Sequence, residues 1–153
     1  MSESIVAPVQ LDSLCVVDSR MHVEPEPAES MREGLDIHYD RGEATVEGEV
    51  ARLTLSLDVS VSLYAADEPS DVRMSAGAKI FVEARCGIPQ DGAPEGIGRY
   101  LTMNCLSIAY SHARSHIMSL TAASPMGTLM IPAILPSVLA DADERKRTER
   151  VEL

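Results

Sequence analysis

The chain has 153 residues and a formal net charge of −11, which suits one domain with its own core. An acidic surface repels nucleic acid and anionic lipid, so we expect neither nucleic acid nor a membrane as a partner. The N-terminal stretch MSESIVAPVQ lacks the basic residues of a signal peptide, and three cysteines without a CxxC pair suit a reducing compartment. These features predict a cytoplasmic protein whose thiols are free and buried.

The first predicted strand covers residues 15–24, CVVDSRMHVE. Its residues alternate between two sides, as in a strand with one solvated face. Prolines at 25 and 27 end it, because proline cannot donate to a central ladder. One side of this strand is expected to carry Cys15, Val17, Ser19, Met21 and Val23.

Three further segments alternate in the same way. LDIHYD places Leu35, Ile37 and Tyr39 on one side. RLTLSLDVSVSLY, residues 52–64, has an apolar residue at every second position, and residues 72–82 continue in phase after the turn AADEPSD. A period of two over such a length excludes a helix, so the last two segments are predicted to pair as a hairpin.

The period changes to that of a helix at residues 97–120. Pro125 follows the end of this helix, and Pro136 is suited to the first turn of a short final one. Strands first and helices last predict an α+β fold, with helices on one face of an antiparallel sheet. The apolar arc of the long helix is wide enough for two partners, the sheet and a second subunit. It contains Leu101, Cys105, Ile108, Ala109, Ala113, Ile117 and Leu120.

The clearest candidate for chemistry is the pair His112 and His116, four residues apart on one helical face. A zinc protease would carry glutamate after the first histidine, where this chain has Ala113. Cys105 could add a third ligand, but closed structural zinc sites need four. Packed or interface histidines are therefore the preferred interpretation, and a metal site is the alternative.

Other catalytic patterns are weak. GIGRYL lacks the full GxGxxG, GxSxG is absent, and residues 36, 38 and 40 (Asp, His, Asp) read as an ordinary solvated strand face. We expect no enzyme activity, no metal and no cofactor.

Residues 11–139 resemble the SecB family of export chaperones. The run ARSHIMSLTA at 113–122 is similar to the family's Ala-Arg-Glu-x-Ile-x-Ser-Leu. The preceding YLTMNCLSIAYSHAR resembles the pattern that ends in Pro-Tyr-Ala-Arg, and SPMGTLMIPAIL resembles the apolar run that follows in the family. This order of motifs, with the long strand pair and the acidic charge, supports the resemblance.

The resemblance implies a four-stranded antiparallel sheet with a long and a short helix packed on one face. It also implies a homo-oligomer, a dimer of dimers, in which long helices pack between dimers. The implied domain spans residues 11–140, between a flexible N-terminus (1–10) and a charged flexible tail (141–153). The expected oligomer interface contains Leu101, Cys105, Ile108, His112 and His116.

The implied function is ATP-independent holding of unfolded or partly folded polypeptides, such as preproteins, in long apolar grooves, so that they stay competent for translocation. Such a protein must expose more apolar surface than a monomer normally tolerates. One groove wall would come from PEPAES and LDIHYD, the other from LMIPAILPSVL. The expected client-binding residues are Leu35, Ile37, Tyr39, Met126, Leu129, Met130, Ile131, Ile134, Leu135 and Leu139.

Docking of the translocase motor ATPase is a further possible partnership, because the family carries an acidic patch on its exposed sheet face. Glu24 suits that patch, but Arg20 brings the opposite charge and Met74 stands where the hairpin would carry acid. An alternative is therefore a SecB-like chaperone dedicated to one partner, such as the antitoxin of a toxin–antitoxin module.

Overall fold

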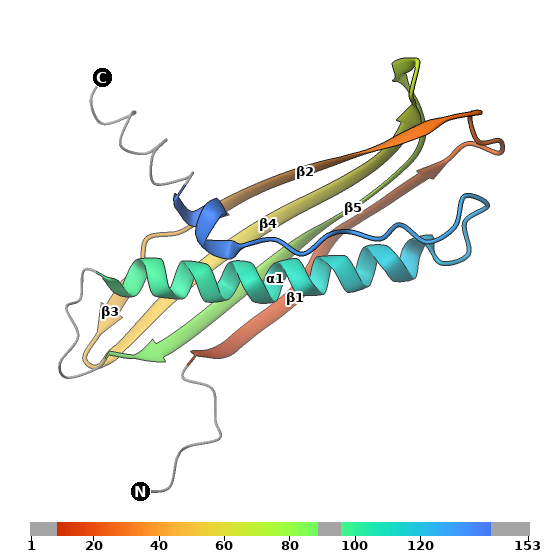
Figure 1. The fold of residues 1–153 in the computed structure, drawn as a ribbon. Coiled ribbons are helices and arrows are strands. Elements are labelled where there is room, and N and C mark those ends of the chain that lie inside the picture. Colours follow the sequence, from red (N-terminus) through yellow and green to blue (C-terminus); the bar gives the residue numbers. More distant parts are fainter. Residues whose placement is uncertain (1–8, 89–95, 142–153) are drawn as a thin grey trace, which may run out of the picture.

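The computed structural model describes residues 9–88 and 96–141. They form an antiparallel sheet, one long helix and a short helix at residues 136–141 (Figure 1). The expectations for residues 1–8, 89–95 and 142–153 lie outside these ranges, and the domain limits stay predictions. The named elements are β1 (Val9–Val23), β2 (Met31–Arg41), β3 (Thr45–Glu47), β4 (Val50–Ala65), β5 (Glu68–Gly87) and α1 (Ile97–Thr121).

The sheet order is β1-β5-β4-β2, and β3 pairs with β4 beyond this path. The α+β class and the antiparallel sheet are confirmed, while the fifth strand, β3, was not predicted. Three residues are too few to carry a visible alternation. Gly48, with φ 61°, follows β3 and makes the turn into β4, a conformation that a side chain would strain.

The predicted hairpin is confirmed as β4 and β5. Leu57 lies opposite Ile80 and Val59 opposite Ala78, all fully buried. Only Ala66 and Asp67 separate the two strands, so both extend into the segment expected to be a turn. Alternate β4 residues face solvent, which gives the sheet one dry and one solvated face.

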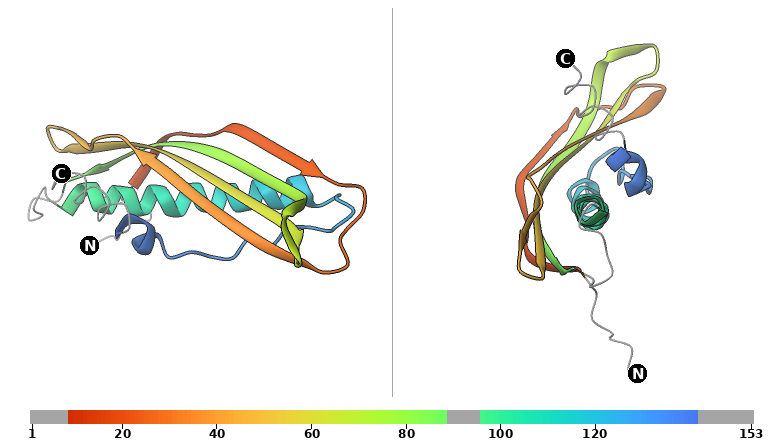
Figure 2. Two further views of the ribbon diagram at one scale, coloured as in Figure 1. Left: turned by 90° about the horizontal axis from the view of Figure 1, so that it is seen from above. Right: turned by 90° about the vertical axis from the view of Figure 1, so that its left-hand side faces the viewer.

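Helix α1 covers the dry face, as expected (Figure 2). Its buried residues include Leu101, Cys105 and Ile117, packed mainly over β5 and β4. Residues 122–141, which we call the arm, return alongside α1 and end in the short helix (Figure 1). That helix begins at Pro136, as predicted.

The prediction of which β1 side chains share one face of the sheet is wrong for the first half of the strand. The strand has bulges between Leu11 and Ser13 and between Val16 and Asp18. A bulge adds one residue and exchanges the faces of everything before it. Cys15 therefore lies opposite Phe81 on the solvated face and is exposed, whereas Cys86 and Cys105 are free and buried as expected.

Candidate functional site

The arm separates its apolar side chains into buried and exposed sets. Leu129 and Ile131 are only 4% and 2% exposed, because they pack into the core between α1 and the sheet. Met130, Leu135 and Val138 are 65%, 69% and 60% exposed. The buried side chains thus anchor the arm to the core, while the other large apolar side chains of the arm are exposed to solvent.

Strand β2 lies along one edge of the sheet and contributes a second set of apolar residues. Leu35, Ile37 and Tyr39 lie opposite buried residues of β4 and are themselves partly buried. The Tyr39 hydroxyl donates a hydrogen bond of 3.1 Å to the carbonyl oxygen of Leu139. This bond ties β2 to the short helix at the end of the arm.

The ten predicted client-binding residues are therefore brought together on β2 and the arm, but with different exposure. Two of them are sealed in the core, two are largely exposed, and the rest are partly buried, namely Leu35, Ile37, Tyr39, Met126, Ile134 and Leu139. Val138 was not among them, although it precedes Leu139 in the same apolar run and is exposed. Client binding by these residues stays a prediction.

The residues of the predicted oligomer interface also differ in exposure. Leu101 and Cys105 are fully buried within the chain, whereas Ile108, His112 and His116 keep part of their surface exposed. His116 Nε2 lies 2.9 Å from Ser19 Oγ of β1. In residues 9–88 and 96–141, no group of three or more His, Cys, Asp or Glu side chains could hold a metal ion. The interface itself stays a prediction.

The two buried thiols are poorly suited to chemistry. Burial, which is the larger cause, and the neighbouring Cys86 together raise the pKa of Cys105 to about 11. Burial also raises the pKa of Cys86. Since the thiolate is the reactive form, both groups are protonated and inert at neutral pH.

On the solvated face of the sheet, Arg20 pairs with two carboxylates. Its guanidinium forms ion pairs of 2.9 Å with Asp18 and 2.5 Å with Asp58. It lies directly over Gly77, where an added Cβ would come within 2.8 Å of the guanidinium carbon. The placing of Met74 on this face is wrong, because its side chain is fully buried on the other side.

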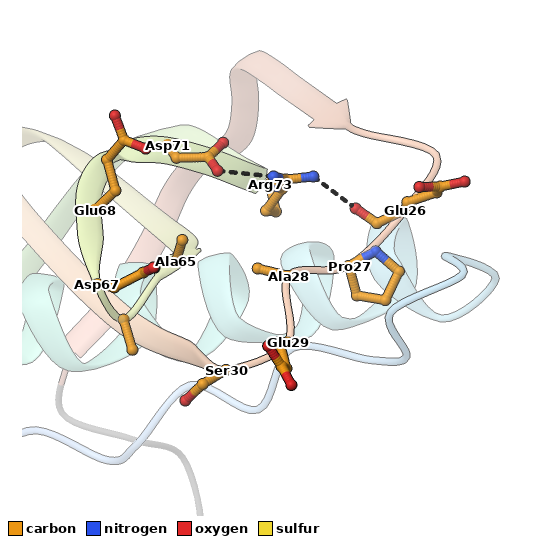
Figure 3. Close-up of a pocket in the computed structure, with 11 residues that line it drawn as sticks. Glu26, Pro27, Ala28, Glu29, Ser30, Ala65, Asp67, Glu68, Asp71 and Arg73 are labelled. Carbon is orange, nitrogen blue, oxygen red and sulfur yellow. Dashed lines mark hydrogen bonds and ion pairs between the residues drawn. The ribbon is translucent and has the colours of Figure 1, made fainter.

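An open pocket of about 560 Å³ lies at one corner, between the β1–β2 crossover and the β4–β5 turn (Figure 3). Arg73 donates to Asp71 Oδ2 at 2.7 Å and to the carbonyl oxygen of Glu26 at 3.2 Å. These bonds tie the crossover to β5, which gives Arg73 a structural role. The acidic residues that line the pocket are Glu26, Glu29, Asp67, Glu68 and Asp71.

No protein-family model matches the chain, and no characterised protein matches it in sequence. Its structure is similar to the SecB-like chaperone Rv1957 of Mycobacterium tuberculosis, solved in complex with a ChAD peptide from the antitoxin HigA1 (Rv1956). The TM-score is 0.58 at 11% identity, over 83% of this chain and 91% of that chain. The protein has a SecB-like fold. The resemblance seen in the sequence is thus confirmed at the level of the fold. In the described part of the chain, no helix is long and apolar enough to cross a membrane.

Proposed function

We propose that this protein is a chaperone that binds unfolded or partly folded polypeptides without ATP. The observation that carries the proposal is the exposure of Met130, Leu135 and Val138 on an anchored arm. Several large apolar side chains exposed on one anchored segment support a binding surface, because covering them with a partner removes apolar area from water. An unfolded polypeptide offers the apolar side chains that would cover them.

The side chains on the arm indicate what kind of client it would hold. The exposed large apolar ones are Met130, Leu135 and Val138, which carry no aromatic ring, and methionine adapts its shape to varied partners. Aliphatic segments of a client are therefore favoured. The net charge of −11 favours clients that carry positive charge around such segments.

Assembly into a homo-oligomer belongs to the same proposal. Edge strand β1 leaves Leu11, Val17 and Met21 between 40% and 54% exposed. Apolar side chains along a sheet edge favour covering by another copy. A dimer of dimers would also cover the exposed side of α1, and the cytoplasm would be the place where such a chaperone meets preproteins.

A second candidate is a chaperone dedicated to one partner, such as an antitoxin. Two observations favour it. Arg20 pairs with Asp18 and Asp58 on the face on which a motor ATPase would dock, so it lowers the negative charge there and argues against a role in export. The similar structure of Rv1957 holds an antitoxin peptide.

Aggregation assays test the main proposal. An unfolded client should scatter less light when the protein is added without nucleotide, and the double variant Met130→Ser/Leu135→Ser should protect less. Val46→Ser is the matched control, since Val46 is 49% exposed on β3, away from the arm. Equal protection by all three proteins, or none by the wild type, would contradict the proposal. Affinities for several unfolded proteins separate the two candidates: similar values favour a general chaperone, and one tight partner favours a dedicated one.

A further inference from the structure

The extended part of the arm, residues 128–134, is not held in place by pairing with a strand. Within the described residues, no main-chain hydrogen bond joins residues 128–134 to a strand of the sheet. Main-chain donors and acceptors need partners when they lie against a protein core. Here the partners come from side chains of α1.

Two bonds hold the first half of this segment. The amide of Leu129 donates to Thr121 Oγ1 at 2.9 Å in a buried position. The guanidinium Nε of Arg114 donates to the carbonyl oxygen of Ile131 at 2.9 Å. Because Arg114 precedes Thr121 by about two helical turns, the arm is held at two separated points of α1.

Tyr110 makes the third bond. Its hydroxyl donates to the carbonyl oxygen of Pro132 at 2.5 Å, and its side chain is 3% exposed. Burial raises the pKa of Tyr110, so the hydroxyl keeps its proton and remains a donor at neutral pH. Tyr110 lies one turn before Arg114, and the two side chains hold successive carbonyls, those of Ile131 and Pro132.

Holding two successive carbonyls fixes the rotation of the chain about its own axis. With Ile131 turned inward, Met130 must point outward, and its side chain is indeed 65% exposed. We propose that Tyr110 and Arg114 are positioning residues of the client-binding surface: they hold the arm so that its exposed apolar side chains face solvent in one arrangement. This inference rests on the proposed function, and it assigns to two helix residues the preorganisation that lowers the entropic cost of binding.

Two substitutions and two controls test the inference. Tyr110→Phe removes one hydroxyl and leaves the ring in place, and Arg114→Met removes the donors but keeps a long stem. Tyr100→Phe makes the same chemical change on the same helix at a residue that is 39% exposed, and Arg114→Lys keeps the charge and a donor. For each protein, amide hydrogen exchange of Leu129, which donates to Thr121 Oγ1 within the arm, and affinity for an unfolded, permanently reduced and alkylated client are measured.

Tyr110→Phe and Arg114→Met should each speed exchange in the arm by about 3- to 10-fold, the effect of one lost hydrogen bond, and weaken client binding by a similar factor. Exchange in β4 and β5 should not change, Tyr100→Phe should match the wild type, and Arg114→Lys should recover part of the loss. The inference is overturned by unchanged exchange in the arm, by a uniform rise across the sheet, or by faster arm exchange with wild-type affinity. Failure of the wild type to bind any client would instead refute the proposed function, and arm exchange would still report whether the two side chains hold the arm.

Discussion

Leu129 and Leu135 lie six residues apart on the arm and allow one substitution to be compared in two settings. Leu129 is 4% exposed and packs in the core, whereas Leu135 is 69% exposed. We expect Leu129→Ala to lower the free energy of unfolding by about 2–5 kcal/mol, since it removes buried methyl groups and leaves a cavity. Leu135→Ala should change it by less than about 0.5 kcal/mol.

The effect on client binding should be reversed. Burying a leucine side chain fully is worth about 1.5–3 kcal/mol. With 69% of Leu135 available to a client, its loss should cost about 1–2 kcal/mol of binding free energy, or roughly 5- to 30-fold in affinity. Leu129→Ala, where it stays folded, should bind within a few-fold of the wild type.

Denaturant unfolding measures the first quantity and fluorescence anisotropy of a labelled, permanently unfolded client the second. The reasoning would be refuted if Leu135→Ala destabilised the fold as much as Leu129→Ala does. It would also be refuted if Leu135→Ala bound clients as tightly as the wild type.

Three further predictions concern the fold that supports the arm. Thr121→Val should lower the free energy of unfolding by about 1–3 kcal/mol in urea titrations, because the amide of Leu129 loses its buried acceptor; an unchanged midpoint would exclude that role. Because the pKa of Cys105 is raised from 9.0 to about 11, its proton leaves the unfolded chain first as pH rises. The contribution of Cys105 to stability should then be constant below about pH 9 and be lost from there toward pH 11. Stability should therefore fall less steeply over this range in Cys105→Ala, and identical slopes would disprove the assignment. Gly77→Ala should displace the Arg20 guanidinium and so abolish the Arg20–Asp58 coupling energy, roughly 0.2–1 kcal/mol for such a pair. A double-mutant cycle that includes Asp58→Asn, carried out with and without Gly77→Ala, measures this coupling energy. An Arg20–Asp58 coupling energy equal to that of the wild type would show that Arg20 is not displaced.

The sheet and the long helix could be predicted because each has one dry face. From Ala51 to Val61 of β4 every second residue is apolar and buried, so the period of two is visible in the sequence. The bulges in β1 could not be predicted in this way. A bulge such as the one at Val17 has no residue type of its own, yet it moves Cys15 to the opposite face.

The arm was predicted as an apolar segment, but its two sides were not distinguished. Residues 128–139 contain few polar positions, so no period marks which side chains turn inward. The inward set is decided by hydrogen bonds from Tyr110 and Arg114 to main-chain carbonyls. Such bonds depend on tertiary packing and leave no pattern in the arm's own sequence.

The central claim is that the exposed side of the arm contacts unfolded clients, and the methionine methyl groups report on it directly. With ¹³C-methyl methionine, Met130, which is 65% exposed, serves as the probe and Met74, which is fully buried, as the internal reference. Titration of an unfolded client without nucleotide should shift or broaden the Met130 methyl resonance in a saturable way and leave that of Met74 in place. A client that binds without affecting Met130, or an unfolded client that leaves every methionine resonance unchanged, would contradict the account.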